Sequence, residues 1–186
     1  MLLADQVKSW RFRNQVRILQ KAEKIIDKKN IPIKEVPLKI LVPLLEKSSL
    51  EENEDLQNKW VGLLVNYVDS RKKYRSTIFP SLLSELSTNE IKCLDYFNLR
   101  TRKESNTIIR FEDIPNNLEI YGVELSNLIR LGLIGKMPPN INILPVELPL
   151  DGWDPDITPN ATYHGNDLRY QMTELGVEFL KACRFE

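Results

Sequence analysis

The stretch SSLEENEDLQNKWVGLLVNYVDS, residues 48–70, joins a run of acidic side chains directly to an apolar segment that contains a tryptophan. Ser49 and Glu52 have the Ser-x-x-Glu spacing of a capping box, which predicts that Ser49 is the N-cap of a helix. The acids would then lie in the first turns of that helix, where its dipole favours negative charge. These acids are Glu51, Glu52, Glu54 and Asp55.

The apolar residues of the same stretch recur at helical spacing and predict one buried face. They are Leu56, Trp60, Leu63, Leu64, Tyr67 and Val68. A metal-binding or catalytic patch is the alternative interpretation of the acids. A metal site needs further converging ligands, however, and the neighbouring sequence supplies none, so we favour the start of a helix.

Two more helices are predicted before this stretch. Apolar residues recur at helical spacing through residues 2–29, and Asn30 suits a left-handed cap at the end of that helix. Residues 37–47 form the second helix, in which Pro37 suits the first position and Pro43 should produce a kink. The core candidates in these two helices are Trp10, Phe12, Leu41 and Leu45.

The sequence from residue 87 onward predicts the order helix, strand, helix, helix, strand, strand, helix, which is typical of a winged helix. Ser87 and Glu90 form a second capping box. Gly132 is expected to end one helix and Thr173 to cap the last one. The side chains expected to face inward are Ile91, Leu94, Phe97, Val123, Leu125, Leu128, Ile129, Leu175, Phe179 and Leu180.

The predicted fold is therefore mainly α. A helical domain with a basic first helix would span residues 1–86, and a winged-helix-like α+β domain would span residues 87–186. Between the two wing strands lies a long insertion, residues 137–168, which holds six of the eleven prolines and is expected to be a loop.

The charges are divided unevenly along the chain, although the net charge is zero. Residues 1–85 have a net charge of +5 and residues 86–186 a net charge of −5. Lys8 to Lys29 holds eight basic and two acidic residues, a composition that attracts nucleic acid, a membrane surface or an acidic partner. A solvated helix face is the alternative. The candidate anion or partner contacts are Arg11, Arg13, Arg17, Lys21, Arg71, Lys72, Lys73 and Arg75.

Residues that usually carry chemistry are sparse. His164 is the only histidine, which argues against a zinc site, and Cys93 and Cys183 are expected to be reduced and buried. No phosphate-binding loop or nucleophile motif is present, so we predict no cofactor, no metal and no catalytic residue, and disfavour an enzyme. The acids that lack the spacing of a calcium loop are Asp151, Asp154 and Asp156.

The sequence also predicts a cytoplasmic protein without a membrane span. No apolar run approaches the length of about 20 residues that crosses a bilayer. The first residues, Met1-Leu2-Leu3-Ala4, are followed at once by charge, whereas a secretory signal needs a basic start and a longer apolar core.

Several of these phrases resemble the Abi-alpha family of bacterial proteins, which is named for abortive infection. The most specific is SLEENEDLQNKWVGLLVN within residues 36–70, and WRFRNQVRILQKAEK (10–24) and IFPSLLSELSTNEIKCLDY (78–96) are further matches. LIRLGLIGK and YQMTELGVEFLKAC, near the end, are shared with many winged helices. The resemblance spans roughly residues 8–185. Family members usually carry a further region before the basic helix, whereas this chain begins almost at that helix, as a short or shortened member would.

The resemblance implies a role in defence against phage and supplies no catalytic residues. Together with the charge division, it favours a non-enzymatic protein that acts through a protein partner, with weak non-specific nucleic-acid binding through the basic first helix. The alternative is a transcriptional regulator that reads DNA with the winged helix. Acidic residues in the presumed recognition helix, Glu119 and Glu124, argue against the alternative because they would repel phosphate.

Overall fold

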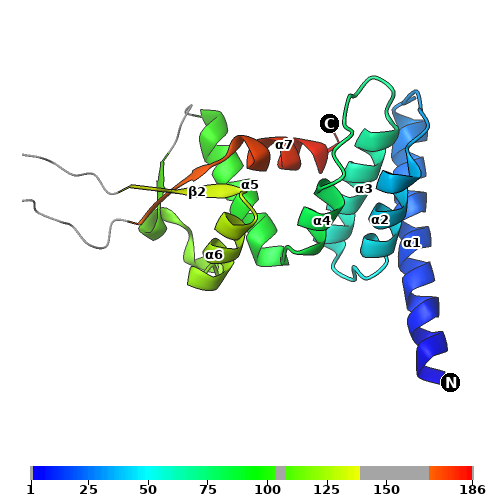
Figure 1. Cartoon of the computed structure of the whole chain (residues 1–186), viewed down its shortest axis with the longest axis horizontal. Coiled ribbons are helices and arrows are strands. Elements are labelled where there is room, and N and C mark those ends of the chain that lie inside the picture. The colour runs from blue at the N-terminus through cyan, green and yellow to red at the C-terminus, as the bar shows by residue number, and fades with distance from the viewer. Residues whose placement is uncertain (1, 104–107, 139–167, 186) are drawn as a thin grey trace, which may run out of the picture.

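A computed structural model describes residues 2–103, 108–138 and 168–185 of the chain. Most of the predicted wing insertion, including Asp151, Asp154 and Asp156, lies outside the described residues. Figure 1 shows an elongated molecule with a group of helices at one end and a smaller group around a short sheet at the other.

The first group contains four helices, in agreement with the prediction that the N-terminal part is helical. They are α1 (Leu2–Lys28), α2 (Leu38–Ser48), α3 (Glu54–Val68) and α4 (Phe79–Ser84). Asn30 has the positive φ of 47° that was expected where α1 ends, and α2 runs through Pro43. Pro37, which was expected at the first position of α2, is instead its N-cap.

The start of α3 is a correction to the predicted capping box. Asn53, not Ser49, is the N-cap, and its side-chain oxygen accepts hydrogen bonds from the backbone N–H groups of Asp55 at 2.9 Å and Leu56 at 3.2 Å. The Ser49 hydroxyl is already used, because it donates to the carbonyl of Glu46 at the end of α2. Glu54 and Asp55 do occupy the first turn, as predicted.

The second group surrounds a three-stranded antiparallel sheet of order β1-β3-β2. Its elements are α5 (Thr88–Lys103), β1 (Ile109–Arg110), the 3-10 turns η1 (Phe111–Asp113) and η2 (Asn116–Leu118), α6 (Gly122–Arg130), β2 (Ile134–Met137), β3 (Arg169–Met172) and α7 (Glu174–Ala182). The caps agree with prediction. Glu90 N donates to the Ser87 hydroxyl, Gly132 has a φ of 70°, and the Thr173 side chain accepts from Gly176 N.

The segment between β1 and α6 differs from the short helix that was predicted there. It forms two 3-10 turns separated at Pro115, which lacks a donor and restricts the conformation of the residue before it. Val123 was expected to be buried but is 77% exposed, because α6 turns only Leu125 and Leu128 into the core.

The described residues share one continuous core, with α3 at its centre. Trp60, Leu63 and Tyr67 are at most 1% exposed, and α3 contacts α1, α2, α5 and α7. The predicted buried face of this helix is confirmed. Trp10 and Phe12, by contrast, are 48% and 66% exposed, so their assignment to the core was wrong.

Gly62 sets how closely α3 approaches the end of α7. A Cβ atom at this position would lie 2.3 Å from the carbonyl oxygen of Cys183, a separation at which backbone must shift. Gly62→Ala should therefore lower the free energy of unfolding by roughly 1 to 3 kcal/mol through overpacking, measured by chemical denaturation.

Gly122→Ala is the matched control for this prediction. Gly122 is also a helical glycine, but nothing lies within 4 Å of a Cβ added there. That variant should match or slightly exceed the wild-type stability, because alanine favours helix more than glycine does. Equal stability of the two variants would contradict the close approach of α3 and α7.

Candidate functional site

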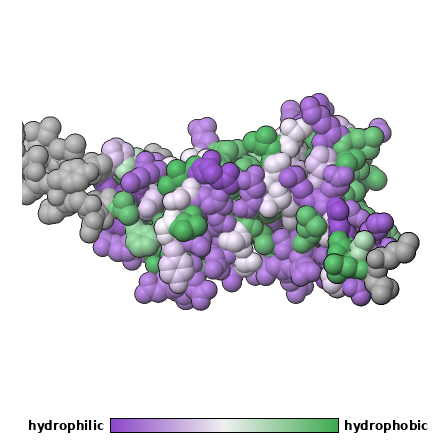
Figure 2. Space-filling view, turned by 60° about the horizontal axis from the view of Figure 1, so that its bottom comes forward, coloured by the Kyte–Doolittle hydropathy of each residue, from purple (hydrophilic) through white to green (hydrophobic). Residues whose placement is uncertain are grey.

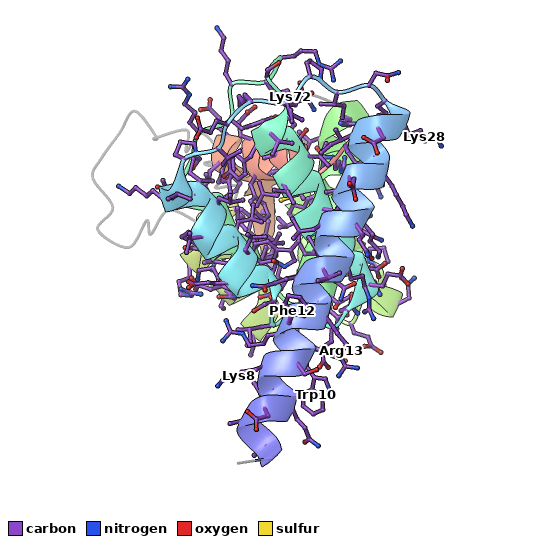
Figure 3. The ribbon with its side chains drawn as sticks, turned by 90° about the vertical axis from the view of Figure 1, so that its right-hand side faces the viewer. Lys8, Trp10, Phe12, Arg13, Lys28 and Lys72 are labelled. Carbon is purple, nitrogen blue, oxygen red and sulfur yellow. The ribbon has the colours of Figure 1, made fainter. Side chains whose placement is uncertain are left out.

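The first half of α1 projects beyond the other helices. Residues 3–13 are all exposed, and Figures 1 and 3 show this half of the helix extending past the bundle. In Figure 2 apolar and hydrophilic side chains alternate over the end of the molecule where α1 begins. This projecting half, residues 2–13, carries Trp10, Phe12 and the first basic residues of the predicted contact set.

Polar contacts with α2 mark the point where α1 leaves the bundle. Arg11 Nε donates to the Ser49 hydroxyl at 2.9 Å, and Asn14 Nδ2 donates to the Ser49 carbonyl at 3.1 Å. Gln15 Nε2 donates to the Leu45 carbonyl at 3.1 Å. The Leu45 carbonyl also accepts from the backbone N–H of Ser49, whereas the Ser49 carbonyl follows the last turn of α2, where helical carbonyl groups lack partners within their own helix.

Half of the predicted contact residues are used inside the protein. Arg11 binds Ser49 as described, and Lys21 Nζ lies 3.2 Å from the Glu54 carboxylate. Arg71 forms an ion pair with Asp69 at 2.9 Å, and Lys72 donates to the Asn66 side chain at 2.6 Å. These four cations position backbone and helices, which reduces their availability to a ligand.

The other half is exposed and has no acidic partner among the described residues. Its members are Arg13, Arg17, Lys73 and Arg75. Arg13 lies on the projecting half of α1 and Arg17 one turn beyond it, whereas Lys73 and Arg75 lie in the loop after α3. Figure 3 shows Lys8 and Arg13 toward the projecting end, and Lys28 and Lys72 at the opposite end of the bundle. The predicted contact set is thus two separate basic surfaces.

The second of these surfaces borders a cleft of about 390 Å³. Arg75 and Tyr74 line it from the loop after α3, Lys34 from the segment that leads into α2, and Lys39 from the first turn of α2. The backbone N–H of Lys34 donates to the Val68 carbonyl at 2.7 Å and so holds the two segments together. Sequence reasoning missed Lys34 and Lys39, because only the chain fold brings them beside Arg75.

The two thiols are buried, as predicted. Cys93 and Cys183 are free cysteines with at most 1% exposure. Burial raises the pKa of each thiol to about 12, so the reactive thiolate is scarce at neutral pH. Within the described ranges, no group of three or more His, Cys, Asp or Glu side chains is arranged to hold a metal ion.

The comparisons with known proteins agree with the resemblance seen in the sequence. The model of the family described as "Abortive infection alpha" matches residues 11–183. The chain belongs to this family. No curated protein and no solved structure matches it. The family match begins at Arg11, so it includes most of the basic helix and leaves out the first ten residues.

None of the helices in the described part of the chain is both long and apolar enough to cross a membrane. In α1, which is the longest of them, charged residues recur along the whole helix.

The thiol assignment makes a direct prediction. In native protein, Ellman's reagent should react with neither Cys93 nor Cys183 over minutes at pH 8, because both are buried and their pKa is raised. In guanidinium chloride both should react at once. Rapid reaction of the folded protein would contradict the burial of these side chains.

The environment of Asp69 predicts that the protein loses stability as the pH falls into the acid range. It is 2% exposed, and its hydrogen bonds with Arg71 lower the pKa of its carboxyl group. The ionised group therefore stabilises the fold above its unfolded pKa, and that stabilisation is lost as pH falls through the lower folded value. Asp69→Asn should lower the melting temperature at pH 7 and reduce the additional loss between pH 5 and pH 3.

Asp27→Asn is the control for that measurement. Asp27 is an exposed acid on α1 whose side chain forms no hydrogen bond or ion pair among the described residues. Its melting temperature and pH profile should match those of wild type. An acid profile of Asp69→Asn that is identical to wild type would show that the Asp69–Arg71 pair does not stabilise the fold.

Proposed function

We propose that this protein acts in bacterial abortive infection, as a non-enzymatic cytoplasmic protein that binds a partner protein through the projecting half of α1 and the next turn, which carries Arg17. Membership of the abortive infection alpha family supports the defence role. The observation that carries the mode of action is the set of basic residues on this helix that have no acidic partner in the described structure, Lys8, Arg13 and Arg17.

An exposed tryptophan supports a protein partner. Trp10 is 48% exposed on the projecting half of α1, which extends past the other helices (Figure 3). Single exposed apolar residues are common, but large aromatic side chains grouped with arginine are typical of the centres of protein interfaces. Basic residues around them would speed association with an acidic partner.

Nucleic-acid binding through a winged helix is the second candidate function. The order α5, β1, α6, β2, β3, α7 and the antiparallel β2–β3 pair support such a fold. The charges of α6 do not favour DNA. The Glu124 carboxylate accepts from Tyr121 N at 2.9 Å at the start of α6, and Arg130 is held by Glu85 at 2.6 Å. A glutamate at the start of α6 would repel phosphate, and an arginine already paired with Glu85 is poorly placed to contact base edges.

A double charge reversal tests the proposed function. Arg13→Glu with Arg17→Glu, in the full chain, should abolish protection of a bacterial host in a phage plaquing assay. Arg11 is left unchanged because it binds Ser49. The melting temperature should stay within a few degrees of wild type, since neither side chain is buried.

Lys24→Glu with Lys28→Glu is the matched control. Both lysines are exposed on the second half of α1, away from the projecting half. This variant should protect as wild type does. Protection that is equal in both double variants would contradict a role for the projecting half.

The same variants separate the two candidate functions when binding to DNA and RNA is measured across a salt series. We expect at most weak binding that disappears at higher salt and with the Arg13 and Arg17 reversals, because non-specific affinity comes from phosphate contacts. Submicromolar, sequence-selective binding that is lost with Arg130→Glu would favour the regulator instead.

A further inference from the structure

An apolar stripe runs along one face of the projecting half of α1. Leu3, Val7 and Trp10 are spaced by four and three residues, which places them on the same side of a helix. They are 71%, 41% and 48% exposed. We refer to these three residues as the open seam.

The open seam continues into a face that is already an interface. The next positions at this spacing are Asn14, which is 9% exposed, and Ile18, which is fully buried. In this second half α1 packs against α3. Lys21 lies beside the packed face and binds the Glu54 carboxylate at 3.2 Å and the Asn58 side chain at 3.1 Å. The same face of α1 therefore already accepts an amphipathic helix with an acidic first turn.

The charges around the open seam select the kind of occupant. Helical geometry places Arg11 on one side of the seam, where its Nε binds Ser49 and its charge remains, and Arg13 and Arg17 on the other side. Asp5 is the only acid between residues 2 and 17. A second copy of the projecting half would bring two basic helices together, which like charges disfavour. An occupant with acidic flanks is complementary on both sides.

The surroundings of the seam favour a helix over a flat surface. Ser49, in the segment between α2 and α3, accepts hydrogen bonds from both Arg11 and Asn14 and so stands beside the upper end of this face. Leu50 follows it and is 67% exposed. Figure 1 shows α1 projecting past the bundle, so the open seam is bordered by other parts of the protein at one end and does not lie on a flat face.

We propose that the projecting half of α1 docks an amphipathic helix of a partner protein, with apolar side chains against Leu3, Val7 and Trp10 and with Asp or Glu beside Arg11, Arg13 and Arg17. The inference rests on the proposed function, because it names the kind of segment that the partner would present. The bound helix would extend the packing of α3 on α1 along the same face.

A pair of synthetic peptides tests this inference with the full chain. One is an 18-residue helical peptide, with leucine at the two core positions of each heptad and glutamate beside them. The other carries lysine in place of glutamate. The labelled glutamate peptide should bind in fluorescence anisotropy at physiological salt, and the lysine peptide should not, because only the first complements the basic flanks.

Variants of exposed residues locate the binding site. Val7→Asp and Trp10→Ala should each weaken the glutamate peptide by about tenfold or more, as loss of a central anchor does. Phe12→Ala is the matched control: Phe12 is 66% exposed on the same part of the helix but lies on the side opposite the open seam, so affinity should be unchanged. All three variants should melt as wild type does.

Several outcomes would overturn the inference. They are equal binding of the two peptides, binding of neither, or a greater loss with Phe12→Ala than with Trp10→Ala. Binding through Trp10 to vesicles of three parts phosphatidylcholine to one part phosphatidylglycerol, without peptide binding, would assign the seam to a membrane. A dimer in analytical ultracentrifugation that Val7→Asp dissociates would assign it to a second copy.

The plaquing assay separates this inference from the proposed function. If Val7→Asp and Trp10→Ala protect as wild type does while the Arg13 and Arg17 reversals do not, the basic surface acts in defence and the helix-docking inference fails. If all of these variants protect, both fail. Loss of protection in both sets, with Phe12→Ala still active, supports both.

Discussion

The close contact between α3 and the C-terminal end of α7 joins the N-terminal group of helices to the group around the sheet. Gly62 leaves space for the carbonyl group of Cys183, which a Cβ would meet at 2.3 Å. One helical turn later, Asn66 Nδ2 donates to the carbonyls of Ala182 at 2.7 Å and Arg184 at 2.6 Å. The Ala182 carbonyl belongs to the last turn of α7 and the Arg184 carbonyl follows the helix, where carbonyl groups lack partners within the helix itself. The position and rotation of α3 therefore follow from two residues, one that must be small and one that must donate.

A charged cluster also links α3 to α5 and to the C-terminal residues. Asp95, on α5, accepts from Lys59 of α3 at 2.8 Å and from Arg184 at 2.6 Å, so one carboxylate links three parts of the chain. Because its side chain is about one-third exposed, this cluster contributes less to stability than the apolar core around it does.

The candidate site is a consequence of the same arrangement. α3 and α2 are shorter than α1, so they cover only its second half, where Ile18 and Ala22 are buried. The remaining turns of α1 keep their amphipathic pattern without a helix to pack on. An apolar stripe with basic residues on both sides is therefore exposed next to an interface of the same kind. This continuity, together with the family membership, directs the proposed function toward a helical partner.

Local signals in the sequence determined where most elements begin and end. Asn30, Gly132 and Thr173 act through their own backbone conformation or side chain, and the Ser87–Glu90 pair closes within one turn, so none needs distant contacts. The buried face of α3 was also predictable, because its apolar residues recur at helical spacing. The burial of Cys93 and Cys183 was also predicted from the sequence.

Only the tertiary structure decided which of several residues with similar sequence signals are buried, cap a helix or form an ion pair. Trp10 and Ile18 fit the same apolar face of one predicted helix. Trp10 is nevertheless 48% exposed and Ile18 is buried, because helical periodicity carries no information about where a neighbouring helix ends. The sequence predicted Ser49 as the cap of α3, but Asn53 caps this helix while α2 and Arg11 engage Ser49. The eight predicted cations look alike in the sequence. Folding pairs four of them with groups far along the chain or across a turn and leaves the other four exposed, since an ion pair requires proximity in space.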